Sequence, residues 1–192
     1  LPRLDAAMLK LIYAIIVGLV GAALLHLIII LALPHYSDRD AYSLAMRLSA
    51  ENRFQLVGLT ENTRHMINGD PFMRHAICTY SIEEAPIRVS GFGVVPFWSV
   101  SVFDKASNEI FSMNERTSVR GQLDVVIADA AQLAAIRKAQ PEELNQSILV
   151  EASRDEGYVV LRSMMPQPSF QQEAERFLKA AKCQRVRIPQ EQ

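Results

Sequence analysis

The stretch PFWSVSVFDKASNEIFSMNER, residues 96–116, carries the clearest β pattern in the chain. Trp98, Val100 and Val102 alternate with other residues, mostly serines, which predicts a strand with one buried and one polar face. The turn signal KASN separates this strand from a second β-rich run, EIFSMN. Residues 97–114 are therefore predicted to form a β-hairpin.

Similar runs rich in β-branched and aromatic residues extend over most of residues 72–161, such as RHAICTYSI, QLDVVIA, SILVEA and GYVVLRSM. Two helical patterns accompany these strands. The segment DAAQLAAIRKAQ opens with a capping pair, Asp129 and Gln132. The later segment SFQQEAERFLKAAKC opens with Ser169 and Gln172 in the same relation. The expected fold is α+β, a mainly antiparallel sheet with flanking helices.

A long apolar segment, residues 11–33, precedes this region and carries no formal charge. As a helix it would be roughly 34 Å long, enough to cross a hydrocarbon core of about 30 Å with modest tilt. A cleaved signal peptide usually has a shorter apolar stretch and a small-x-small cleavage site, whereas this one ends in bulky residues around Pro34. A buried core helix is disfavoured because no amphipathic face is visible. We therefore expect an uncleaved transmembrane helix that ends at Pro34.

Small residues recur every four positions in this segment, at Ala14, Gly18 and Ala22, and His26 continues the series. Positions four apart share one helix face, and small-xxx-small stripes let two membrane helices approach closely. An imidazole facing lipid would leave a polar group unsatisfied. These four residues are predicted to face a partner helix, although Gly and Ala are common in any membrane helix. A haem or metal ligand is disfavoured because one histidine does not make a site.

The expected organisation is a cytoplasmic tail at 1–10, a span at 11–33, a juxtamembrane helix and linker at 34–71, and an α+β domain at 72–192. The juxtamembrane helix is predicted from SDRDAYSLAMRLS, which opens with a capping pair that begins at Ser37. Basic residues flank the span on both sides, so their count scarcely decides the orientation. A short N-terminal tail before a single span usually stays in the cytoplasm, so the N-terminus is expected there.

Two cysteines lie in the domain, Cys78 in a predicted strand and Cys183 at the end of the predicted terminal helix. Outside the cytoplasm they are expected to form a disulfide, whereas in a reducing compartment they would be two free thiols. A nucleophilic pair of Cys78 with His75 is disfavoured, because positions three apart on a strand point to opposite faces. His65 could approach Cys78 only from elsewhere in the fold.

The net charge of −1 argues against nucleic acid as a partner. The sequence contains no nucleophile elbow, phosphate loop, zinc-protease helix or paired-cysteine metal motif, so no cofactor or metal is expected. Ser99 and Ser101 are interpreted as solvent-face residues of a strand rather than nucleophiles. Trp98, Asn114 and Arg116 form a polar rim that could bind a ligand or dock on a partner, although such strand ends more often cap a loop.

The hairpin sequence resembles small Gram-negative membrane proteins of the domain-of-unknown-function 1254/1214 group. The resemblance rests on the single span, the strand WSVSVFD, the run IFSMN followed by Arg116, the strands SILVEA and GYVVLRSMMP, and a terminal helix that ends in a cysteine. It covers most of the chain after residue 34. It implies an inner-membrane protein whose domain, residues 72–192, lies in the periplasm. It implies no established chemistry.

The leading hypothesis is a membrane-anchored accessory or assembly subunit. It would bind another integral membrane protein through its span and its domain, within membrane lipid. The rival hypothesis is a cell-envelope enzyme or small-ligand-binding protein that uses the polar rim. Of the two, the non-enzymatic function is favoured.

Overall fold

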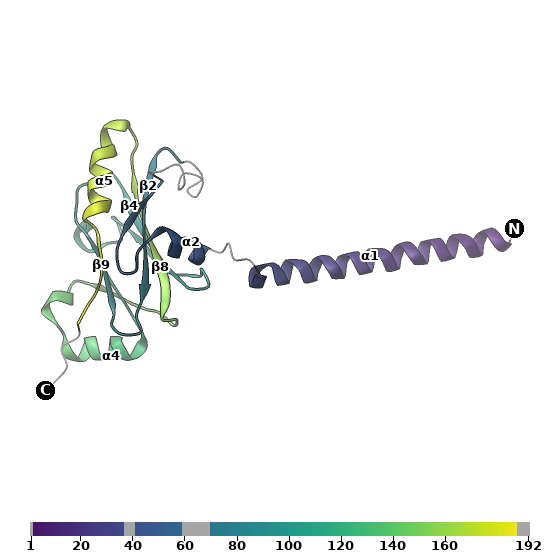
Figure 1. Ribbon diagram of the computed structural model, residues 1–192, viewed down its shortest axis with the longest axis horizontal. Helices are drawn as coiled ribbons and strands as arrows, with labels where there is room; N and C mark the ends of the chain where they lie inside the picture. The colour runs from purple at the N-terminus through teal and green to yellow at the C-terminus, as the bar shows by residue number, and fades with distance from the viewer. Residues whose placement is uncertain (1, 37–40, 59–69, 188–192) are drawn as a thin grey trace. The chain divides into compact units, whose positions relative to one another are not determined.

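The computed structural model forms two compact units, which divide after Asp40 and are described separately. The capping pair expected at Ser37 and the side chain of His65 lie outside the described residues. The structure describes residues 2–36, 41–58 and 70–187 (Figure 1).

The first unit contains one long helix, α1 (Pro2–Tyr36). Its candidate membrane span is Ala7–Ala32, with a mean hydropathy of 2.8 and no buried residue. The helix is thus long and apolar enough to cross a membrane. The sequence predicts an end at Pro34, but α1 continues to Tyr36. The fixed φ of proline suits a helix, and this close to the C-terminal end the missing N–H removes only one backbone hydrogen bond.

The second unit alternates strands with three α-helices among its described residues. Its elements follow in the order α2 (Ala41–Leu48), β1 (Gln55–Val57), β2 (Met73–Ser81), β3 (Ile87–Gly91), β4 (Trp98–Asp104), β5 (Glu109–Asn114), β6 (Leu123–Ala128), α4 (Ala130–Ala139), β7 (Ile148–Glu151), β8 (Glu156–Met164), α5 (Gln171–Ala180) and β9 (Lys182–Arg185).

The strands form two sheets rather than one. The first sheet has the order β1-β2-β8-β4-β5, and every neighbouring pair in it is antiparallel. It contains the predicted hairpin as β4 and β5, with a register shift between Val102 and Phe103. The α+β fold with mainly antiparallel pairing is therefore confirmed.

The second sheet has the order β7-β6-β3-β9. Its β6 and β7 are parallel, because α4 carries the chain back between them. The predicted capping box of α4 is confirmed, since the Asp129 carboxylate accepts from the backbone N–H of Gln132 at 2.7 Å. The Gln132 side chain completes the box by accepting from the backbone N–H of Asp129 at 3.1 Å.

One hydrophobic core joins the two sheets. Alternate residues of each strand point into it, as the period of a strand requires. On β4 these are the three residues that the sequence pattern placed on the buried face, and each is at most 2% exposed. The core includes Ala76, Cys78, Tyr80, Ile87, Val89, Trp98, Val100, Val102, Leu123, Val125, Ile127, Val159, Leu161, Phe177 and Leu178.

Helices α2 and α4 cover outward surfaces of the two sheets, whereas α5 adds Phe177 and Leu178 to the core between them. Figure 1 shows α4 and α5 at opposite ends of the domain. Leu133 and Ile136 of α4 pack with Val126 and Ala128 from the outward side of β6. Helix α2 packs on β2 and β8 of the first sheet, where Ala45 is 1% exposed. These helices bury apolar residues that would otherwise face water.

The region after β8 differs from its sequence prediction in two respects. A 3₁₀ turn (Pro168–Phe170) precedes α5, so Ser169 does not cap the helix. The helix also ends at Ala180, and Cys183 lies on β9 rather than in the helix. The backbone of Ser90 and its neighbours on β3 pairs with this segment, and that non-local pairing overrides its local helical pattern.

Cys78 and Cys183 form a disulfide, the pairing that the sequence predicts. The Cα atoms are 6.6 Å apart, and the residues are 105 positions apart in the chain. Because Cys78 belongs to β2 and Cys183 to β9, the bond joins the two sheets through the core. Both residues are buried, at 0% and 3% exposure.

Candidate functional site

The small residues that recur every four positions on α1 are exposed on the surface of the helix. Ala14, Gly18, Ala22 and His26 are all exposed in the described part of the chain. A Cβ atom added at Gly18 would meet no heavy atom within 4 Å. The same exposure extends along residues 7–31 of the span, and the small side chains of the stripe make this face shallow enough for another helix to come close.

Trp98 lies in the core rather than on a rim. It is 2% exposed, and its ring centroid lies 6.3 Å from that of Phe177 on α5. Its indole N–H donates to the Gly121 carbonyl at 3.2 Å. Trp98 therefore anchors the connection between β5 and β6, and any contribution to binding would come through the position of that loop.

Asn114 and Arg116 shape the start of the same loop. The Asn114 side-chain oxygen accepts from the backbone N–H groups of Arg116 at 3.0 Å and Thr117 at 3.2 Å. This is an Asx turn, which satisfies backbone donors where the strand ends. The Arg116 side chain is 87% exposed and lies 3.5 Å from the Glu115 carboxylate. The three predicted rim residues thus lie at the same end of the β4–β5 hairpin, but their side chains do not converge.

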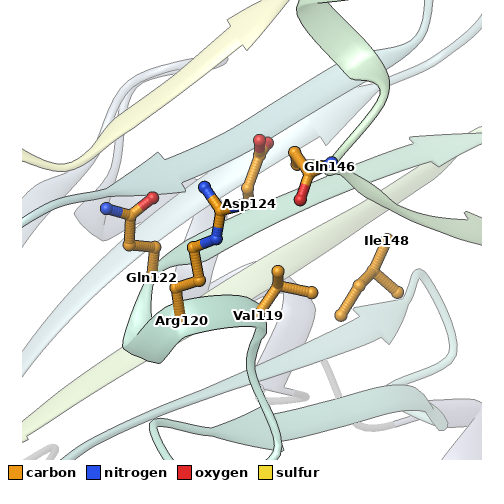
Figure 2. A pocket seen from close by; sticks show the side chains of 6 residues that line it. All are labelled: Val119, Arg120, Gln122, Asp124, Gln146 and Ile148. Atoms are coloured by element: carbon orange, nitrogen blue, oxygen red, sulfur yellow. The ribbon is translucent and has the colours of Figure 1, made fainter.

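A small polar hollow lies farther along this loop (Figure 2). Its volume is about 30 Å³, room for one water molecule. Arg120 adopts a left-handed conformation there, with φ of 56°, which is uncommon for a residue with a side chain. The hollow is lined by Val119, Arg120, Gln122, Asp124, Gln146 and Ile148.

The one carboxylate that lines this hollow, that of Asp124, is already paired with an arginine. Asp124 accepts two hydrogen bonds from the Arg88 guanidinium, both at 2.8 Å. This bidentate pair raises the pKa of Arg88, chiefly through the hydrogen bond to Asp124. With its acid neutralised and its volume that of a water molecule, the hollow suits an ordered water better than a substrate.

The described residues offer no group of three or more His, Cys, Asp or Glu side chains that could hold a metal ion. The disulfide also leaves no free cysteine in the described chain. His75 and Cys78 lie on opposite faces of β2, since the register pairs His75 with Arg162 and Cys78 with the inward-facing Val159. Thiol chemistry at Cys78 therefore requires reduction of the bond.

The outward face of the first sheet carries a row of polar residues that the sequence patterns do not predict. His75 on β2, Arg162 on β8 and Ser99 on β4 are register partners, so they stand side by side across three strands. Arg162 donates to the Ser101 hydroxyl at 3.0 Å, and Ser101 is 6% exposed. The only sequence signal was one arginine within the apolar strand GYVVLRSM. Strand pairing, which brings the other members beside it, cannot be read from that run.

The fold and these sites define a small α+β sandwich domain that follows an apolar helix. Comparison with known proteins adds a fold but no activity. No family model matches the chain, and no curated protein matches it.

The chain resembles parts of two solved structures. The VPA0106 protein from Vibrio parahaemolyticus superposes with a TM-score of 0.53 at 14% identity, over 73% of this chain and 33% of the other. An uncharacterised protein from Burkholderia cenocepacia gives a TM-score of 0.49 at 12% identity, over 79% of this chain and 40% of the other. The present chain thus matches about a third of the length of the Vibrio protein.

Proposed function

We propose that this protein is a membrane-anchored accessory or assembly subunit that binds another integral membrane protein. Helix α1 would cross the bacterial inner membrane once, with the N-terminus in the cytoplasm and the domain in the periplasm. The observation that carries the proposal is the stripe Ala14, Gly18, Ala22 and His26, on a helix without a buried residue in its candidate span. A histidine at this depth in a membrane is costly unless it faces protein or water.

The disulfide supports the proposed compartment. Disulfides persist in the periplasm and are rare in the cytosol, where thiols are kept reduced. The bond between Cys78 and Cys183 lies inside the core, so it is a structural bond of the fold. The resemblance to the domain-of-unknown-function 1254/1214 group points to the same compartment, and membership of that group is part of the proposal.

Exposed apolar side chains on the domain support a partner for it as well. In the loop between β3 and β4, Phe92 is 59% exposed and Val94 is 95% exposed. The loop borders a hollow formed with Phe177 and Ala180 of α5. Large apolar side chains grouped beside a hollow are typical of surfaces that contact another protein. We assign this surface to the same membrane partner.

An envelope protein that binds a small ligand is the second candidate function. The polar row of His75, Arg162 and Ser99 favours it, because an arginine without an acidic partner can bind an anion. Co-purification in mild detergent distinguishes the two candidates. A stoichiometric partner supports the subunit, and a monomer that binds a ligand at the row supports the second function.

The orientation predicts the behaviour of a reporter fused after Gln192. A reporter that matures only in the periplasm should be active, because a single uncleaved span with an internal N-terminus places the C-terminus outside. A fusion to a reporter that works only in the cytoplasm is the matched control and should be silent. Activity of that cytoplasmic reporter would contradict the topology.

The stripe predicts graded effects of substitution on partner binding. Gly18→Leu fills the groove and should strongly reduce the partner retained on tagged protein, because the helices can no longer approach closely. His26→Leu should reduce retention less, since hydrogen bonds inside membranes average only about 0.6 kcal/mol. Val17→Leu is the control, because its side chain points about 100° away from position 18. Retention is measured by quantitative mass spectrometry of the detergent-solubilised complex.

Comparable expression and membrane insertion of the three variants are required for this comparison. If Gly18→Leu retains as much partner as the unmodified chain, the stripe is ordinary membrane composition and the proposed helix contact is wrong.

A further inference from the structure

The outward face of the first sheet has two differently covered halves. Helix α2 packs over one half, where Ser49 donates to the Thr79 hydroxyl at 3.3 Å and the ring of Tyr42 lies 6.4 Å from that of Tyr158. Beyond α2, the outward-facing register partners on β2, β8 and β4 form successive rows across the sheet. Ile77 and Val160 form the next row, and the row of His75, Arg162 and Ser99 follows it.

Arg162 is the only permanently charged member of this polar row, and no described residue forms an ion pair with it. Its one hydrogen bond is from Nη1 to the Ser101 hydroxyl at 3.0 Å. A guanidinium carries five N–H donors, so most of them remain available. Arg162 is partly exposed among the described residues, and none of its nitrogens is a fully buried, unpaired atom.

His75 stands beside Arg162 as a neutral group. Burial is the main reason why the pKa of His75 is lowered from its ordinary value, and the positive charge of Arg162 lowers this pKa further. Asp70 raises the pKa in part, and Arg74 lowers it slightly. The imidazole Nδ1 is buried without a hydrogen-bond partner. A buried polar atom without a partner is unfavourable, so a rotation of the ring that lets a bound ligand pair with it would be favourable.

The charge and shape of the row select among anions. One arginine beside a neutral histidine supplies a single positive charge, which matches a monoanion better than a phosphate dianion. The planar guanidinium fork matches a carboxylate, with two parallel hydrogen bonds. The hydroxyl of Ser99 lies on the other side of Arg162 as a further donor. The adjacent row of partly buried Ile77 and Val160 offers an apolar surface to the carbon body of the ligand.

We propose that Arg162, with His75 and Ser99 beside it, binds a carboxylate group on the outward face of the first sheet. Arg162 pairs with the carboxylate, Ser101 holds the guanidinium in place, and an imidazole N–H of His75 donates one hydrogen bond to the carboxylate. The carboxylate belongs either to a small organic acid or to an acidic side chain of a polypeptide. This site is independent of the helix contact proposed for α1.

The test is a titration of the 192-residue chain in detergent micelles. NMR spectra report binding through the Arg162 Nε–Hε signal and, in variants at position 162, through the His75 imidazole signals. The probes are acetate, a blocked aspartyl tripeptide and inorganic phosphate. Acetate should shift the Arg162 signal, and phosphate should bind no more tightly than acetate. The tripeptide should bind more tightly than acetate if the natural ligand is protein-borne, and no more tightly if it is a free acid.

Arg162→Gln should weaken acetate binding about tenfold or more, the loss expected for a charge-assisted bidentate pair. Arg116→Gln removes an exposed arginine outside the row and should leave binding unchanged. Arg162→Lys keeps the charge without the fork, and it should weaken binding by a smaller factor even if the glutamine variant fails to fold. The proposal is overturned if acetate does not bind, if Arg162→Gln or Arg162→Lys binds acetate as the unmodified chain does, or if phosphate binds more tightly than acetate.

Discussion

Reduction of the disulfide between Cys78 and Cys183 should lower the free energy of unfolding by about 4–5 kcal/mol. The bond closes a loop with a sequence separation of 105, and cross-linking a loop of this size strongly restricts the unfolded chain. It also fastens β2 of one sheet to β9 of the other, so its loss removes the covalent link across the core. Denaturant unfolding with and without a thiol reductant measures the difference.

A double variant, Cys78→Ala with Cys183→Ala, is the control for this measurement. It should match the reduced protein in stability and should not respond to reductant. Peptide mapping without reductant should first find the two cysteine peptides linked. Two freely alkylated thiols in native protein, or a loss below about 1 kcal/mol on reduction, would contradict the stabilising role of the bond.

Gly157→Ala should destabilise the domain by about 3 kcal/mol or more, because no space exists for a methyl group there. A Cβ atom at this position would lie 2.6 Å from Cζ of Tyr80, and it would also overlap the Phe103 carbonyl oxygen. Tyr80 cannot easily move away, since it is 2% exposed and its hydroxyl donates to that same carbonyl at 3.1 Å. The backbone of β4 would have to shift away from β8, which weakens the centre of the first sheet.

Gly91→Ala is the matched control at another strand glycine. Its nearest contacts would be the side chains of Leu123 at 3.4 Å, Phe177 at 3.5 Å and Ala181 at 3.6 Å, which are ordinary packing distances. The change should alter the free energy of unfolding by less than about 1 kcal/mol, since alanine also restricts the unfolded chain. If both variants melt at the same temperature as the unmodified protein, the packing argument at Gly157 is wrong.

Local patterns were sufficient to predict much of this fold. Alternation along β4 identified the three residues that point into the core, and the turn signal after it located the hairpin. The pair Asp129 and Gln132 identified the start of α4. In these cases the physical cause lies within a few residues, so the sequence displays it directly.

The division into two sheets could not be predicted in the same way. Strand β9 has a single buried residue, Cys183, among exposed polar neighbours, so nothing in its own composition marks it as a strand. It forms because β3 offers it a partner about 90 residues earlier in the chain, a pairing that only the folded chain provides.

The candidate sites likewise divide into those defined by local spacing and those formed by non-local strand pairing. The stripe on α1 is a matter of helical spacing, so its residues could be grouped from the sequence. The alternation in β4 predicts a buried Trp98, whereas the rim hypothesis places it beside Asn114 and Arg116, and the ring is in fact buried. Arg162 could not be recognised as a candidate binding residue from the sequence, because only strand pairing places His75 and Ser99 beside it.

The strand order has a consequence for the way in which the protein must be made. Strand β8 lies between β2 and β4, so the first sheet cannot close until residue 164 has left the ribosome. The second sheet waits longer still, for β9. If the chain is threaded across a membrane from its N-terminus, β2 and β4 emerge with their edges unpaired and prone to join other chains. Folding is thus postponed until β8 and β9 have emerged, and the nascent domain depends on protection during that interval.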